Sequence, residues 1–157
     1  MNNKKPFSYD KKVVSKPWGK EHVVYRNSNK LSVTLLKIDY NKRTSLHCHP
    51  TKKTGFIVLS GKALIQLGLW KSSSKIYSAP SKLMIRTGLF HSIKARSKKG
   101  LCALEFETPV NKKDLVRYKD SYGREKKSYE GKKFTTLISK NDVFFKKTKK
   151  KIVQKYI

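Results

Sequence analysis

The sequence predicts an all-β fold, a sandwich or barrel of short strands, on three observations. Runs of β-branched, aromatic and aliphatic residues recur at short spacing between residues 21 and 107, turn-forming residues separate these runs, and apolar and polar residues alternate within them. About nine strands in fewer than ninety residues are typical of all-β sandwiches and barrels. The chain has 157 residues, the size of one domain with a sizeable core.

Each expected strand ends at a turn signal. Pro50 ends the third strand because proline cannot donate to a strand ladder, and Ser60-Gly61 predicts a hairpin between the fourth and fifth. Ala79-Pro80 and Thr87-Gly88 separate later strands in the same way. The nine strands are expected over residues 21–26, 31–40, 43–49, 55–60, 62–67, 75–78, 83–86, 90–95 and 101–107.

The pattern changes after Pro109. Asn111 is a candidate cap for a short helix over residues 112–119, with Leu115, Val116 and Tyr118 on its apolar side. From residue 131 the chain is rich in lysine, and its apolar residues, 134–138 and Phe144-Phe145, are compatible with an edge strand, a terminal helix or a frayed end. We therefore expect a basic N-terminal arm over residues 1–14, a domain over residues 15–125 and a basic C-terminal extension over residues 126–157.

The formal net charge of +28 raises the question of nucleic-acid binding. Half of this charge lies in the first 20 and the last 32 residues, and the chain has 32 lysines but only 6 arginines, whereas base recognition favours arginine. No helix-turn-helix, zinc-finger or aromatic RNA-binding motif occurs in the sequence. Solvated lysine-rich ends therefore explain the charge better than a nucleic-acid partner does.

The sequence also predicts a cytoplasmic protein. No apolar run approaches the roughly 18 residues of a membrane span, and the first residues lack the apolar region of a secretory signal. The two cysteines, Cys48 and Cys102, form no spaced disulfide framework, which favours a reducing compartment.

Histidines supply the strongest chemical signal. His47 and His49 lie two residues apart at the end of an expected strand, so their side chains project from the same face and can bind one ion together. His91 is the second residue of another expected strand, over residues 90–95, and imidazole is the commonest metal-binding side chain. His22 lies alone on a different strand, and we interpret it as a packing or surface residue.

The motifs around these histidines resemble a known family. In order along the chain they are Lys-Pro-Trp-Gly-Lys-Glu (16–21), Ser-Leu-His-Cys-His (45–49), Phe-Ile-Val-Leu-Ser-Gly (56–61), Gly-Leu-Phe-His (88–91) and Asp-Leu-Val-Arg-Tyr-Lys-Asp-Ser-Tyr-Gly-Arg (114–124). This series resembles the cupin domain of type II mannose-6-phosphate isomerases, usually the C-terminal part of a bifunctional mannose-1-phosphate guanylyltransferase. The resemblance implies a double-stranded β-helix (cupin jelly roll), a metal held in its lumen by two motifs, and a homodimer.

The chain departs from this family at the metal motif. His47 takes the position of a glutamine, His49 and His91 match the family histidines, and Thr54 takes the position of a glutamate. Arg86 replaces a proline near the second motif. The resemblance thus implies a neutral set of three histidines, which suits Zn, Fe, Ni or Cu, whereas Mg and Ca require oxygen ligands.

Four further residues are candidates for the site. Alternation places Glu105 on one strand face with Glu107; it can act as a general base, replace the missing metal ligand, or form a salt bridge with a lysine. By position in the family motifs, Lys52 is a candidate phosphate contact near the metal. Arg117 can bind phosphate through its fork, or pair with Asp114 or Asp120 to stabilise the expected helix. Trp18 is expected to pack over the barrel or line the pocket.

Together these features predict a metal-binding cupin that acts on a sugar phosphate or a nucleotide-linked sugar by isomerisation or epimerisation. Glu105 and Lys52 are the expected catalytic residues, and Arg117 and Trp18 are the expected substrate-binding residues. Two alternatives remain open at this stage: a three-histidine iron dioxygenase, and a sugar-binding module without catalytic activity.

Overall fold

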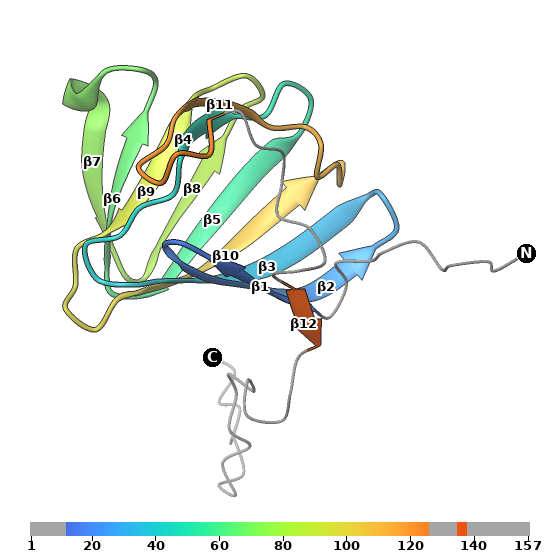
Figure 1. The fold of residues 1–157 in the computed structure, drawn as a ribbon, viewed down its shortest axis with the longest axis horizontal. Coiled ribbons are helices and arrows are strands. Elements are labelled where there is room, and N and C mark those ends of the chain that lie inside the picture. The colour runs from blue at the N-terminus through green and yellow to red at the C-terminus, as the bar shows by residue number, and fades with distance from the viewer. Residues whose placement is uncertain (1–11, 126–134, 138–157) are drawn as a thin grey trace, which may run out of the picture.

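The computed structural model describes residues 12–125 and 135–137, which form two antiparallel sheets packed in two layers (Figure 1). The larger sheet has the strand order β12-β1-β2-β3-β10-β5-β8, and the smaller has the order β11-β4-β9-β6-β7. The elements are β1 (Lys12–Lys16), β2 (Gly19–Asn27), β3 (Leu31–Ile38), β4 (Leu46–Cys48), β5 (Lys53–Ser60), β6 (Lys62–Leu67), the 3-10 turn η1 (Lys71–Ser73), β7 (Ser74–Ser78), β8 (Ser81–Ile85), β9 (His91–Ala95), β10 (Leu101–Thr108), β11 (Val116–Lys119) and β12 (Thr135–Leu137).

The all-β prediction is confirmed, and the nine expected strands correspond to β2 through β10. β4 is shorter than expected, because Arg43 makes only an isolated bridge with Lys94 before the strand begins. Of the three alternatives for the C-terminal apolar residues, β12 is an edge strand that pairs with β1. Phe144 and Phe145 lie outside the described residues. No helix in the described part of the chain is long and apolar enough to cross a membrane.

The prediction of a helix over residues 112–119 is wrong. The chain turns at residues 112–113 and then forms β11, which pairs with β4 so that Val116 is opposite Cys48 and Arg117 is opposite His47. An eight-residue helix is marginal without tertiary support. Pairing with the edge of the smaller sheet satisfies the same backbone groups, and this tertiary contact outweighs the weak local helix signal.

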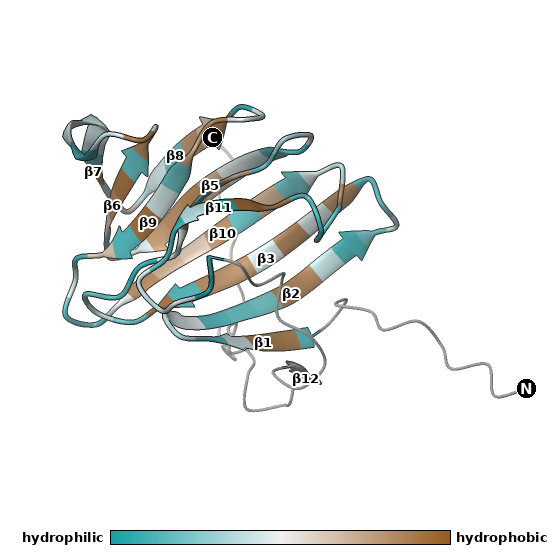
Figure 2. Cartoon of the chain, turned by 45° about the horizontal axis from the view of Figure 1, so that its top comes forward, coloured by the Kyte–Doolittle hydropathy of each residue, from teal (hydrophilic) through white to brown (hydrophobic). Residues whose placement is uncertain are grey.

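The hydrophobic core lies between the two sheets. Apolar and polar residues alternate along β3 (Figure 2), and the residues of one of its faces, Ser32, Thr34, Leu36 and Ile38, are buried in the interior. The buried residues of this core come from both layers: Trp18, Leu36, Ile38, Phe56, Val58, Ala63, Ile65, Ile85, Ile93, Ala95 and Leu101.

A single glycine explains how Trp18 enters this core. Gly19 has a φ of 143°, and a Cβ atom at this position would lie 2.0 Å from the carbonyl oxygen of Lys37. Only glycine fits so close an approach between β2 and β3. The turn between β1 and β2 can therefore direct Trp18 inward, where its side chain is buried.

Candidate metal centre and its cavity

The three histidines of the two sequence motifs converge in the structure. His47 lies on β4, His49 follows its last residue, and His91 opens β9 as the direct cross-strand partner of His47. The ring centroids are 4.6 Å apart for His47 and His91, 5.0 Å for His47 and His49, and 5.4 Å for His49 and His91. One nitrogen from each ring lies within 4.8 Å of the other two, a spacing at which all three can bind one ion.

Backbone carbonyl groups determine which nitrogen of each ring is available. In each ring, Nδ1 donates a hydrogen bond to a backbone carbonyl oxygen. His47 donates to Ser45 at 2.8 Å, His49 to Asp114 at 2.6 Å, and His91 to Leu89 at 2.9 Å. A carbonyl oxygen only accepts, so the proton of each neutral ring is on Nδ1. The lone pair is therefore on Nε2, the arrangement found in most histidine metal sites.

The electrostatics also fit a metal. Burial lowers the pKa of His49 to about 3 and, in spite of its backbone hydrogen bond, the pKa of His91 to about 4. Burial and the neighbouring His91 and His49 rings hold the pKa of His47 well below its usual value. Nε2 of His91 is buried without a hydrogen-bond partner among the described residues. The rings are thus neutral, as metal binding requires, and a bound ion would satisfy this nitrogen.

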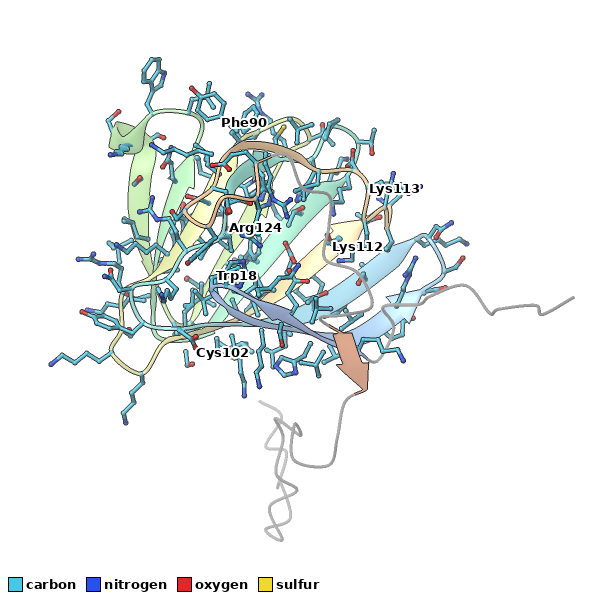
Figure 3. All side chains as sticks on the ribbon, in the orientation of Figure 1. Trp18, Phe90, Cys102, Lys112, Lys113 and Arg124 are labelled. Carbon is cyan, nitrogen blue, oxygen red and sulfur yellow. The ribbon has the colours of Figure 1, made fainter. Side chains whose placement is uncertain are left out.

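The histidines line a cavity between the sheets that contains all seven candidate residues. Its wall combines apolar side chains with charged ones. Figure 3 labels three lining residues that come from separate segments, Trp18, Lys112 and Arg124. The candidates that line the cavity are Trp18, His47, His49, Lys52, His91, Glu105 and Arg117.

Lys52 and Lys112 hold Glu107 between them in this cavity. The Lys52 ammonium group contacts one carboxylate oxygen of Glu107, and Lys112 Nζ lies 2.7 Å from the other. The Lys52 and Glu107 side chains are each 3% exposed, so this is a buried ion network. Although burial favours the neutral acid, the two ammonium groups hold the pKa of Glu107 well below its usual range. Sequence reasoning assigned no role to Glu107 or Lys112.

Glu105 lies on the same face of β10 as Glu107 but in a different electrostatic environment. Burial, reinforced by the nearby negative charge of Glu107, raises the pKa of Glu105 to about 8. Glu105 therefore keeps its proton through most of the neutral range. The cluster of mutually close donor atoms comprises the three histidines and no carboxylate within the described residues, so Glu105 is not part of it. The salt bridge with a lysine that we considered for Glu105 is formed by Glu107, which contacts Lys52 and Lys112.

Thr54, at the position of the family glutamate, lies beside Glu107 rather than in the histidine cluster. The two residues are cross-strand partners in the register of β5 and β10. Thr54 is 1% exposed, and its hydroxyl group has no hydrogen-bond partner in the described part of the chain. The carboxylate beside Thr54 therefore belongs to Glu107 on the neighbouring strand β10.

The segment after β10 closes one side of the cavity. Leu115 and Arg117 line it, and Nη1 of Arg117 lies 3.4 Å from the carbonyl oxygen of Arg124. The aspartates expected to pair with Arg117 are engaged elsewhere: Asp120 pairs with the Arg124 guanidinium at 2.8 Å, and Asp114 accepts from backbone N–H groups. The structural role expected of Arg117 in a helix is thus wrong, because the helix does not form.

Comparisons with known proteins agree with this architecture. The family model described as mannose-6-phosphate isomerase C-terminal matches residues 2–120. The chain belongs to this family. No curated protein matches the sequence.

Solved structures resemble this mannose-6-phosphate isomerase C-terminal domain in fold. A Klebsiella pneumoniae protein with a double-stranded β-helix domain matches with a TM-score of 0.53 and 19% identity, over 58% of this chain and 76% of its own. KdgF from a Halomonas species matches with a TM-score of 0.54 and 16% identity, over 61% of this chain and 84% of its own. A sugar phosphate isomerase of the cupin superfamily from Silicibacter pomeroyi matches with a TM-score of 0.52 and 11% identity, over 58% and 59%. These likenesses show a cupin fold.

Proposed function

We propose that the protein is a metal-dependent cupin enzyme that transfers protons on a sugar phosphate or nucleotide-linked sugar, as in isomerisation or epimerisation. The observation that carries the proposal is the content of one cavity: three imidazole Nε2 atoms, a proton-bearing carboxyl group and buried ammonium groups. Membership of the mannose-6-phosphate isomerase C-terminal family supports a phosphorylated sugar as the substrate.

His47, His49 and His91 would hold the metal through Nε2. Three neutral nitrogen donors favour Zn, Fe or Ni, and they disfavour Mg and Ca, which need oxygen ligands. When bound there, the ion would supply positive charge that polarises a carbonyl or hydroxyl group of the substrate.

Glu105 would move the proton. A carboxyl group with a pKa of about 8 is a stronger base than an ordinary glutamate, and it still ionises partly near neutral pH. Lys52 and Arg117 would hold the phosphate, the arginine through its two-pronged donor fork. Trp18 would present an apolar wall to the sugar ring.

A second candidate function, an iron-dependent dioxygenase, is favoured by one observation. The donor cluster consists of three neutral histidines without a carboxylate in the described residues. Such a set leaves open positions on an iron ion for oxygen and substrate.

Metal analysis and isotope exchange together test these functions. Protein purified without added metal is analysed for its metal content, then incubated with hexose phosphates in deuterated water and with oxygen in a closed cell. Bound metal and deuterium incorporation at a carbon beside the carbonyl group would support the proposal. Iron with oxygen uptake would support the dioxygenase. Bound sugar phosphate with neither reaction would identify a sugar-binding module and refute both enzymatic functions.

We also infer a cytoplasmic homodimer. Cys48 and Cys102 are free thiols, as expected in a reducing compartment. Ile57, Leu59 and Met84 are exposed on the outer face of β5 and β8, where two jelly rolls could pair. Sedimentation analysis would show twice the chain mass of 18.2 kDa; a monomer at micromolar concentration would contradict the inference.

A further inference from the structure

The segment over residues 111–119, here named the cover segment, contacts both the histidine cluster and the ion network around Glu107. Lys112 binds Glu107, Leu115 and Arg117 line the cavity wall, and Arg117 is the strand partner of His47. The cover segment therefore lies against both the candidate metal ligands and the buried lysines. A residue that holds the cover segment to both the metal ligands and the buried lysines would link the two groups.

Asp114 makes these connections. Its carbonyl oxygen accepts the Nδ1 hydrogen of His49 at 2.6 Å. Its carboxylate accepts the backbone N–H of Thr51, 3.1 Å from each oxygen, and that of Lys52 at 2.9 Å. Asp114 is 7% exposed, and its bonds with His49 and with the N–H of Lys52 are buried. One residue thus orients a metal ligand and the turn that carries Lys52.

We propose that Asp114 is a positioning residue that couples metal binding at His49 to anion binding at Lys52. The inference rests on the proposed function in that the anion is the phosphate group of the substrate. An anion drawn to Lys52 and Lys112 stabilises the turn and the cover segment, which hold His49 with Nε2 directed to the metal position. Because coupling of two binding equilibria is reciprocal, a bound metal must tighten anion binding by the same factor.

A purely structural aspartate would behave differently. It would lower the midpoint of thermal unfolding when removed, but the folded variant would bind metal and anion independently and with ordinary affinity. The distinguishing measurement is therefore the metal affinity of the folded protein, with and without phosphate, rather than stability or turnover.

The test uses Co²⁺ as the metal probe and inorganic phosphate as the anion. Visible absorption reports the Co²⁺ dissociation constant of the wild-type protein, Asp114→Ala and Asp114→Asn. Asn111→Ala is the matched control, because the Asn111 side chain accepts only the N–H of Lys113 among the described contacts and is exposed. Circular dichroism at the same temperature establishes that each variant is folded.

Phosphate should tighten Co²⁺ binding several-fold in the wild-type protein and in Asn111→Ala. Asp114→Ala keeps the backbone carbonyl that accepts from His49 but loses the carboxylate that fixes this carbonyl to Thr51 and Lys52, so Co²⁺ binding should weaken several-fold and the phosphate effect should disappear. Asp114→Asn keeps one acceptor oxygen, so its Co²⁺ affinity should lie between that of the wild-type protein and that of Asp114→Ala. Folded Asp114 variants with wild-type affinity and a wild-type phosphate effect would overturn the inference. A wild-type protein that shows the coupling but no deuterium exchange would overturn only the proposed catalysis and would still support the role of Asp114.

Discussion

His47 on β4 and His91 on β9 are direct partners in the antiparallel register of the smaller sheet, with their ring centroids 4.6 Å apart. Cross-strand partners project from the same face, so the sheet itself brings two of the three donors together. His49, two residues beyond His47, joins them from the same strand end. The donor set therefore depends on strand register, and a shift by one residue would direct these side chains to the outer face.

Removal of His49 should abolish tight metal binding. His49→Ala leaves two nitrogen donors, which bind a transition metal far more weakly than three do, and we expect at least a tenfold loss of Zn²⁺ or Co²⁺ affinity. Equilibrium dialysis with metal analysis measures this affinity. His22→Gln, a change at the buried histidine outside the cluster, should keep the wild-type stoichiometry. Unchanged occupancy in His49→Ala would refute the site.

Lys52 should contribute to the binding of a phosphorylated ligand. Lys52→Ala removes a buried ammonium group from the cavity wall, so KM should rise more for a sugar phosphate than for the corresponding free sugar. The neighbouring Lys53 is exposed, which makes Lys53→Ala a matched control for charge and position. Equal increases for the two substrates in Lys52→Ala would exclude a phosphate contact.

The ion network around Glu107 should be essential to stability. Glu107→Ala leaves Lys52 and Lys112 close together without their carboxylate, and we expect a loss of about 3–5 kcal/mol, typical of a buried ion network that loses one partner. Urea unfolding at pH 7 measures the loss. Thr108→Ala, at the exposed next residue of β10, should cost far less. A similar loss in both variants would show that the network is not responsible.

Some of this arrangement could be predicted from the sequence because it follows from strand periodicity. Alternation along residues 101–107 was enough to place Glu105 and Glu107 on one strand face, and the His-x-His spacing was enough to place two donors on one face. The lysine partners of Glu107 were not predictable in this way, because Lys52 and Lys112 lie outside strand β10 and reach Glu107 only through the tertiary fold. The segment over residues 112–119 was assigned to a helix, since its apolar residues fit a helix locally and its pairing with β4 depends on tertiary structure.

β1 was missed for a related reason. Lys12–Lys16 contains only two apolar residues between lysines, so it resembles the lysine-rich end of the chain. It becomes a strand because it lies between β2 and β12 in the larger sheet, and those pairings cannot be derived from five residues alone.

Glu105 should make the protein less stable as pH rises. Its pKa is about 8 in the folded state against 4.5 in the unfolded chain, so below pH 4.5 the proton is bound in both states and the stabilisation is complete. Between pH 4.5 and 8 the unfolded chain releases this proton while the folded protein retains it, and rising pH therefore favours unfolding. Glu105→Gln cannot ionise, so the wild-type protein should lose stability relative to this variant between pH 5 and 8. We expect a relative loss of about 1–2 kcal/mol, less than the full shift implies, because the side chain is only half-buried beside the cavity. Urea unfolding of the metal-free proteins at the two pH values measures the difference; parallel pH profiles would mean that Glu105 ionises normally and is unsuited to serve as the proposed base.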